Sequence, residues 1–174
     1  PNSNHSPPVG AQGNLLKKVP LIIDPKYGDL DMDTLMFLSN FHEPLSTRIL
    51  EVGANQEPSS RILSDNGYSV LGIDLRPDDY ENRWPLNYAR LEGDFIQLSS
   101  YLTGGFQAIF STSAVEHFGL GTYGVHDPIR DPNYDSKAMD CMWHLLKNDG
   151  NCYITVPYGK RFFTGKHVGR GHGF

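Results

Sequence analysis

The chain has few cysteines, no long apolar stretch and no excess of basic residues. Its 174 residues include two cysteines, and 15 Lys and Arg stand against 20 Asp and Glu, for a formal net charge of −5. Two cysteines exclude a disulfide-rich scaffold. A membrane-spanning helix needs roughly 18 or more consecutive apolar residues, and the sequence contains no such run, so no membrane span is expected. The negative charge excludes a general nucleic-acid binder.

The two cysteines also bear on the cellular compartment. Cys141 falls in a helical pattern and Cys152 in a strand pattern, so both are predicted to be reduced thiols of the core. The polar, proline-rich first residues do not resemble a secretory signal peptide. We therefore expect a protein of the cytoplasm.

Composition divides the chain into an arm and one domain. Residues 1–20 are rich in proline and poor in large apolar side chains, so they are predicted to be a flexible arm. Residues 21–174 suit a single domain. Its end, 157–174, is glycine-rich and basic, and this tail is either a solvated terminal segment or a contact for a substrate phosphate. The basic residues of the tail are Lys160, Arg161, Lys166 and Arg170.

Short apolar runs alternate with helical patterns, which indicates a parallel sheet covered on both faces. Right-handed crossovers predict a doubly wound, Rossmann-like sheet in the strand order 3-2-1-4-5. The predicted strands are Arg48–Val52, Ser69–Asp74, Tyr88–Leu91, Gln107–Phe110 and Asn151–Val156. A first helix is predicted from Asp31 or Asp33 to about Phe41, with Leu35, Met36, Leu38 and Phe41 on its buried side. Further helical segments are predicted from Pro58 to Asn66, from Ser113 to Gly119, and from Asp131 or Asn133 to Asn148–Gly150.

Two predicted strand ends carry residues suited to a nucleoside. The first strand leads into Gly53-Ala54-Asn55, and the second ends in Asp74, whose carboxylate can accept hydrogen bonds from both hydroxyls of a ribose. The first loop lacks the G-x-G-x-x-G pattern that a pyrophosphate needs, and Glu57 lies where phosphates would bind. This counts against a nicotinamide-dependent reductase and favours S-adenosylmethionine, which has no phosphate. Asn55 tolerates a left-handed backbone where a glycine is otherwise found.

With these motifs in order, residues 45–160 resemble the class I S-adenosylmethionine-dependent methyltransferases. The segments that carry the resemblance are Glu51–Asn55, Asp74, Gly93-Asp94-Phe95, Phe110–His117, and Met142–Gly150 running into Tyr153–Pro157. The stretches "SAVEHFGLGTYG…DP" and "VPYG" are also similar to small methyltransferase-like domains of unassigned function that are linked to glycan assembly. The resemblance implies S-adenosylmethionine as cofactor and S-adenosylhomocysteine as product.

The resemblance also implies roles for individual residues. Glu51, Gly53, Ala54 and Asn55 would surround the methionine end, Asp74 would bind the ribose, and Leu75 would pack on the adenine. Asp94 would accept the adenine amino group, Phe95 would offer a backbone amide, and Ser111 to Ser113 would close the pocket near the sulfonium. Two alternatives stay open from the residues alone. Asp94 would instead cap the turn that follows it, and Glu51 would cap the next helix.

The chain departs from the family at its end. The family sheet normally has a sixth and a seventh strand, and the residues after Val156 are not expected to supply them. Because a sheet that stops at its fifth strand has an exposed edge, we expect a longer natural chain or a partner at this edge, such as a second copy in a homo-oligomer. A catalytically degenerate module that uses the fold for binding or oligomerisation is the alternative to an enzyme.

The loop after the fourth strand is predicted to hold the acceptor site, because it overhangs the methyl group. His117 is the first candidate for a general base that takes the proton of an acceptor hydroxyl, with Glu116 or Asp127 to orient it. His126 with Asp127 is the second candidate, and Tyr123 and Arg130 are predicted to contact the substrate. The predicted acceptor is a small molecule or glycan. No metal site is predicted, although Asp127, Asp131 or Asp135 together with Glu116 would suit Mg²⁺.

Overall fold

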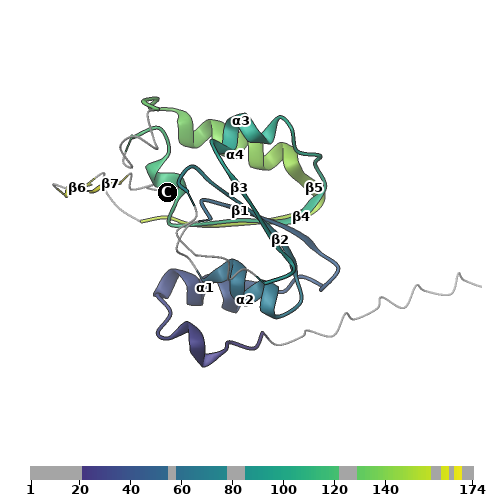
Figure 1. Cartoon of the computed structure of the whole chain (residues 1–174). Helices are drawn as coiled ribbons and strands as arrows, with labels where there is room; N and C mark the ends of the chain where they lie inside the picture. The colour runs from purple at the N-terminus through teal and green to yellow at the C-terminus, as the bar shows by residue number, and fades with distance from the viewer. Residues whose placement is uncertain are drawn as a thin grey trace, which may run out of the picture.

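A computed structural model describes residues 21–54, 58–77, 85–121, 129–157, 162–164 and 167–169. At its centre is a five-stranded sheet in the order β3-β2-β1-β4-β5 (Figure 1). All four neighbouring pairs of strands are parallel, which confirms the predicted doubly wound sheet. The strands are β1 (Arg48–Val52), β2 (Ser69–Asp74), β3 (Tyr88–Glu92), β4 (Phe106–Thr112) and β5 (Leu146–Thr155).

Helices cover both faces of the sheet. The helices α1 (Met32–Asn40) and α2 (Ser59–Asp65) lie on one face, and α3 (Phe95–Ser99) and α4 (Tyr134–Leu145) lie on the other (Figure 1). Two short 3₁₀ helices, η1 (Pro25–Tyr27) and η2 (Val115–His117), precede α1 and follow β4. Outside the main sheet, β6 (Phe162–Thr164) and β7 (His167–Gly169) form a separate antiparallel pair within the predicted basic tail.

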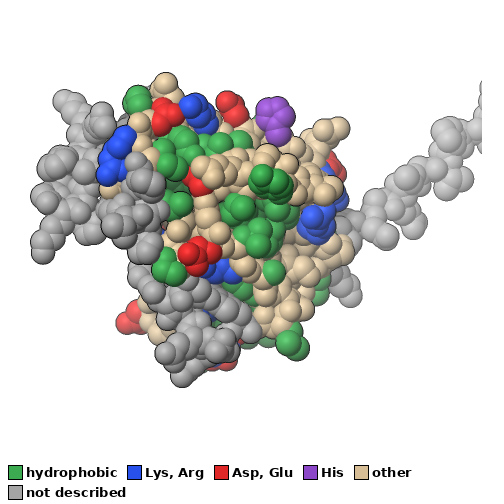
Figure 2. Space-filling view, turned by 45° about the horizontal axis from the view of Figure 1, so that its top comes forward, with side chains coloured by type: hydrophobic (Ala, Val, Ile, Leu, Met, Phe, Trp, Pro, Cys, Tyr) green, Lys and Arg blue, Asp and Glu red, His purple; other side chains and the backbone are tan. Residues whose placement is uncertain are grey.

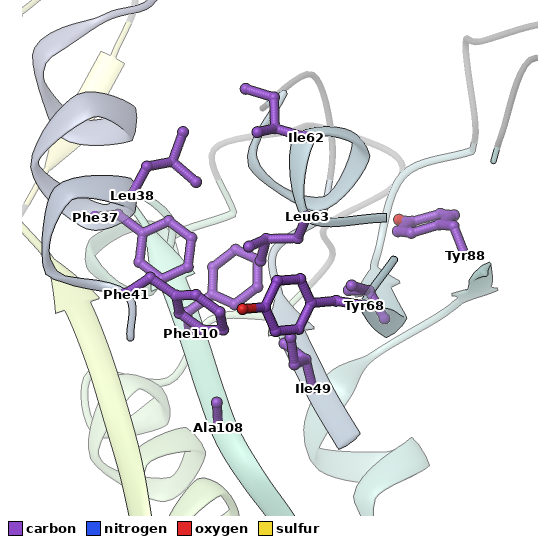
Figure 3. Close-up of a cluster of buried hydrophobic side chains, with 11 residues drawn as sticks. Phe37, Leu38, Phe41, Ile49, Ile62, Leu63, Tyr68, Tyr88, Ala108 and Phe110 are labelled. Atoms are coloured by element: carbon purple, nitrogen blue, oxygen red, sulfur yellow. The ribbon is translucent and has the colours of Figure 1, made fainter. Parts of the chain in front are cut away.

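The sheet divides the core into two layers, and aromatic residues dominate the layer under α1 and α2 (Figure 3). The ring of Phe37 stacks on Phe110 of β4 with 4.3 Å between centroids. Phe41 meets Tyr68 edge-on at 5.3 Å. Such aromatic pairs add about 0.5–1.5 kcal/mol each to the burial of their surface. The first pair fixes α1 against β4, the strand that leads to η2, and the second fixes the end of α1 against the start of β2.

The predicted buried side of α1 was partly wrong. Leu38 and Phe41 are buried as expected, but Leu35 and Met36 are 41% and 54% exposed. Helix α1 instead buries Thr34, Phe37, Leu38 and Phe41, which have the spacing of one helical stripe. Asp31 caps the helix by accepting a hydrogen bond from the amide of Thr34 at 2.7 Å. Because the apolar residues of α1 lie on more than one side of the helix, its sequence did not reveal which stripe faces the sheet.

The predicted boundary between α4 and the last strand was also wrong. The helix ends at Leu145 and β5 begins at Leu146, whereas the sequence placed the helix end at Asn148–Gly150. Leu146 pairs with Phe106 and Asn151 with Ala108, with a shift of register between them. Pairing with β4 therefore draws Leu146 out of the helix, an example of tertiary contacts overriding local propensity.

Both cysteines are free thiols, as predicted. Cys141 is half-buried and packs against the core, but Cys152 is exposed, so its predicted place in the core was wrong. Figure 2 shows apolar side chains on the face that α3 and α4 cover, and among the exposed ones are Met139 and Trp143 of α4. Among the described helices, none is long and apolar enough to cross a membrane.

Candidate functional site

A pocket opens where β1, β2 and β4 end, at the edge where parallel sheets bind ligands. It encloses about 540 Å³ of empty space, part of it open to solvent. The described residues that line it are Gly53, Ile73, Asp74, Leu75, Arg76, Gly93, Asp94, Phe95, Ala114, His117, Phe118, Gly119, Ile129 and Tyr134. Six residues that the sequence singled out are therefore brought to one cavity: Gly53, Asp74, Leu75, Asp94, Phe95 and His117.

The loop after β1 makes a close approach that only glycine permits. Gly53 has a φ of 89°, and a Cβ on it would lie 2.3 Å from the Cβ of Ala114. Its amide donates to the carbonyl of Ile73 at 2.8 Å, and the amide of Ala54 donates to the same oxygen at 3.1 Å. Ala54 is buried and is not among the described lining residues. The next predicted loop residue, Asn55, lies outside the described residues.

Asp74 ends β2 with its carboxylate at the pocket. The residue is 6% exposed. Its Oδ1 accepts hydrogen bonds from the backbone amide of Arg76 at 2.7 Å and from the Nε of Arg76 at 3.2 Å. Both hydrogen bonds from described residues go to Oδ1, so none of these residues donates to Oδ2. A ligand hydroxyl therefore has an acceptor in Oδ2, and Arg76 fixes the orientation of the carboxylate.

Asp94 and Tyr134 form a second polar group in the same wall. The Oδ1 of Asp94 accepts from the amide of Gln97 at 2.8 Å and so caps α3, as the structural alternative expected. The same oxygen accepts from the hydroxyl of Tyr134 at 2.9 Å. Burial and this hydrogen bond raise the pKa of Tyr134, so the phenol stays protonated at neutral pH. Phe95 follows the cap, and its side chain is 4% exposed within the core.

Glu116 and His117, which follow β4, lie in different places, one in the interior and one in the pocket wall. His117 lines the pocket, whereas Glu116 is 2% exposed and is not among the described lining residues. The Nε2 of His117 lies 4.0 Å from the Oε1 of Glu116. The Oε2 of Glu116 is buried without a hydrogen-bond partner among the described residues. Burial, with a smaller contribution from the negative charge of Asp33, raises the pKa of Glu116 to about 7.

Three predicted cofactor residues lie away from the described pocket lining. Glu51 is buried beneath α2 and accepts a hydrogen bond from the hydroxyl of Ser60, in the first turn of that helix. Ser111 is 1% exposed within β4, and its hydroxyl has no hydrogen-bond partner among the described residues. Ser113 has a φ of 46°, and its hydroxyl donates to the carboxylate of Asp33 in α1. These contacts tie the strand ends to the α1–α2 layer.

The predicted acceptor residues are only partly described. Tyr123, His126 and Asp127 lie outside the described residues. Arg130 is exposed, and its guanidinium lies against Gly121, where a Cβ would come within 1.3 Å of it. The described residues contain no group of three or more His, Cys, Asp or Glu side chains that could hold a metal ion.

Sequence reasoning gave no site role to six side chains of the pocket wall. They are Ile73, Arg76, Ala114, Phe118, Ile129 and Tyr134. Arg76 lies two residues after Asp74, a spacing at which an Asp side chain commonly bonds the backbone ahead of it, and this signal was present in the sequence. Phe118, Ile129 and Tyr134 come from a 3₁₀ turn, a loop and the start of α4, whose positions depend on tertiary packing.

The fold can be compared with known proteins. No model of a known protein family matches the chain, and no curated protein does. Several solved structures do match the chain. A TehB-like S-adenosylmethionine-dependent methyltransferase from Corynebacterium glutamicum has a TM-score of 0.56 at 22% identity, over 80% of this chain and 70% of that one. The 1,6-didemethyltoxoflavin-N1-methyltransferase of Burkholderia thailandensis has a TM-score of 0.54 at 16% identity, over 73% of this chain. The glycopeptide N-methyltransferase MtfA has a TM-score of 0.53 at 14% identity, over 74% of this chain.

These likenesses establish the fold. The chain has the Rossmann-like fold of S-adenosylmethionine-dependent methyltransferases, with the strand order 3-2-1-4-5. It spans about half of the length of two of these proteins, 51% of the Burkholderia enzyme and 53% of MtfA.

Proposed function

We propose that this protein binds S-adenosylmethionine in the pocket at the ends of β1, β2 and β4 and transfers its methyl group to an acceptor. The observation that carries the proposal is the meeting of three residues around one cavity: Gly53 just after β1, Asp74 at the end of β2, and Asp94 between β3 and α3. Two of the similar proteins, the Burkholderia enzyme and MtfA, were solved with S-adenosylhomocysteine and with S-adenosylmethionine. Their identity to this chain is low, so the likeness supports the proposal through the fold alone.

The residues fit the cofactor in charge and in shape. Asp74 offers Oδ2 to a ribose hydroxyl, and Leu75, Phe118 and Ile129 give the apolar walls that an adenine needs. The bare Cα of Gly53 allows close backbone approach near Ala114. The wall holds the carboxylates of Asp74 and Asp94, and Arg76 pairs with Asp74, so the remaining charge of Asp94 disfavours a phosphate and suits a ligand with positive charge on sulfur and nitrogen.

The finer proposal is methylation of a hydroxyl group, with His117 as the general base. When bound, S-adenosylmethionine supplies an electrophilic methyl carbon on a positively charged sulfur. His117 lies in the pocket wall and can take the proton from an acceptor hydroxyl, which is a weak nucleophile until that proton leaves. Ionised Glu116, 4.0 Å away, would stabilise the imidazolium that results. We retain a small molecule or glycan as the acceptor class.

The test has two stages. Isothermal titration calorimetry with S-adenosylhomocysteine decides the cofactor, with NAD as the comparison ligand. We expect binding of the first and not of the second, and a folded sample that binds no S-adenosylhomocysteine at high micromolar concentration would refute the proposal. Methyl transfer to hydroxyl and amine acceptors, including nucleotide sugars and free glycans, decides the chemistry.

The base is tested with a matched pair of variants. His117→Ala should spare cofactor binding and slow transfer to a hydroxyl by about 100-fold or more, the usual contribution of general base catalysis. His144→Ala is the control, because this exposed histidine on α4 is outside the described pocket lining and its Nδ1 lies 2.6 Å from the carbonyl oxygen of Asp140 in its own helix. Equal turnover of the two variants would remove His117 as the base. Transfer only to amines would replace O-methylation by N-methylation, as in two of the similar proteins.

A further inference from the structure

Arg90 of β3 joins the bases of two pocket loops from outside the pocket. Its Nη2 donates to the carbonyl of Arg76 at 2.6 Å, and its Nε donates to the carbonyl of Ala54 at 3.3 Å. Ala54 is the second residue of the loop after β1, and Arg76 belongs to the loop after β2. Arg90 is half-buried and is not among the described residues that line the pocket.

Strand β2, which lies between β3 and β1, leaves room for the side chain of Arg90 to extend across it. Gly72 of β2 is the register partner of Arg90, so the two residues share one face of the sheet. A Cβ on Gly72 would lie 2.1 Å from the hydroxyl of Tyr88 and 2.7 Å from the Cβ of Ala54. Because Gly72 has no side chain, residues from β1 and β3 come together over β2. The carbonyl of Ala54 is therefore within reach of a side chain from the edge strand.

The two carbonyls that Arg90 holds are next to the residues that would bind the cofactor. Ala54 directly follows Gly53, and Arg76 orients the carboxylate of Asp74 through two hydrogen bonds. The amides of Gly53 and Ala54 both donate to the carbonyl of Ile73, so the two loop bases already touch. The guanidinium of Arg90 therefore adds a second connection between the wall that carries Gly53 and the wall that carries Asp74.

We propose that Arg90 is a positioning residue that holds the two loops at the spacing required for cofactor binding. The proposal rests on the proposed function, since it deepens the cofactor site. The planar guanidinium has donors in a fixed fork, so it can bond two carbonyls at once at a defined separation. Lysine has one flexible ammonium group and cannot reproduce that spacing. Arg90 acts through the backbone of Ala54 and Arg76, and does not itself touch the ligand.

The decisive experiment compares Arg90→Met and Arg90→Lys with the wild type by calorimetry with S-adenosylhomocysteine. The titrations are run well below the unfolding midpoint of each protein. We expect Arg90→Met to bind at least tenfold more weakly, because a smaller fraction of molecules would hold the competent loop geometry. Arg90→Lys should restore less than half of the lost affinity for S-adenosylhomocysteine, compared on a logarithmic scale of the dissociation constant. Arg48→Met is the matched control, because Arg48 lies at the opposite end of β1 and packs on Phe106.

A second measurement tests the positioning role of Arg90 without any ligand. Hydrogen exchange should be faster in Arg90→Met at the amides of Gly53 and Ala54, whose bonds to Ile73 join the loops, and unchanged at Leu50 in the middle of β1. Wild-type protein that binds no S-adenosylhomocysteine would refute the proposed function. The exchange experiment would still decide whether Arg90 holds the two loops together. Unchanged exchange at these two amides, or affinity within twofold of a wild type that binds, would overturn the role of Arg90.

Discussion

The strongest prediction concerns the substitution Asp74→Ala. The carboxylate is 6% exposed, and its Oδ1 already accepts two hydrogen bonds from Arg76. Ribose hydroxyls would donate to the remaining acceptor sites of the same carboxylate. A hydrogen bond to a charged group is worth about 1.5–3 kcal/mol, so the loss of two such bonds costs about 3 kcal/mol or more. Since about 1.4 kcal/mol corresponds to a factor of ten, we expect affinity for S-adenosylhomocysteine to fall by roughly 100-fold or more.

Calorimetry with matched variants separates this effect from a general loss of acidic charge. Asp74→Asn keeps one acceptor oxygen and the shape of the side chain, so its affinity should lie between those of the wild type and the alanine variant. Glu92→Ala is the control, because Glu92 is the register partner of Asp74 on β3 but is exposed and outside the described pocket lining. Binding by a folded Asp74→Ala protein within threefold of the wild type would refute the assignment of the ribose site.

Three further predictions address the surrounding structure. Gly53→Ala should reduce cofactor affinity at least tenfold, because the new Cβ meets Ala114 at 2.3 Å; calorimetry checks this, and unchanged affinity would show that the loop can yield. Tyr134→Phe should weaken binding by about tenfold, since the carboxylate of Asp94 loses the hydrogen bond from the Tyr134 hydroxyl, worth about 1.5–3 kcal/mol, and part of its fixed orientation; binding equal to the wild type would show that this bond does not position Asp94 for the ligand. Burial raises the pKa of Glu116 from 4.5 to about 7, so the folded protein binds its proton more tightly than the unfolded chain. This group therefore lowers the free energy of unfolding by up to about 3 kcal/mol as the pH rises from about 4.5 to above 7. Urea unfolding should show this decline in the wild type and not in Glu116→Gln, and parallel curves for the two proteins would contradict the assignment.

The central sheet was predictable because its strands are short, apolar and clearly separated. Arg48–Val52 and Ser69–Asp74 were predicted to the residue, since loop signals bound each run and neither can form a stable helix. The chirality of crossover connections then fixed the strand order. Asp74 and Gly53 follow from the same logic, because parallel strands deliver their last residues to one edge whatever the tertiary details.

Elements whose position depends on partners could not be predicted. Helix α3 is only five residues long and consists of Phe95–Ser99, so its periodicity carries no signal. Leu146 lies in a sequence that suits a helix, and only its pairing with Phe106 shows that β5 begins there. The bond from Ser113 to Asp33 joins residues that are far apart in the chain, and nothing local in either segment indicates it.

Glu116 lies in the interior and His117 in the pocket wall because of the way β4 ends. Ser113 holds a left-handed φ of 46°, and its amide donates to the backbone oxygen of Thr155 at 3.1 Å while its hydroxyl bonds Asp33. An L-residue adopts that conformation only when its surroundings impose it. Since η2 begins two residues later and is one turn long, its rotation is set by this fixed point. One neighbour, Glu116, is thereby turned into the interior and the other, His117, into the pocket. When the buried carboxyl of Glu116 ionises beside the imidazole of His117, the free energy of unfolding falls. Packing alone does not require a carboxyl at this position. A proton-accepting role for His117 would explain why one is there.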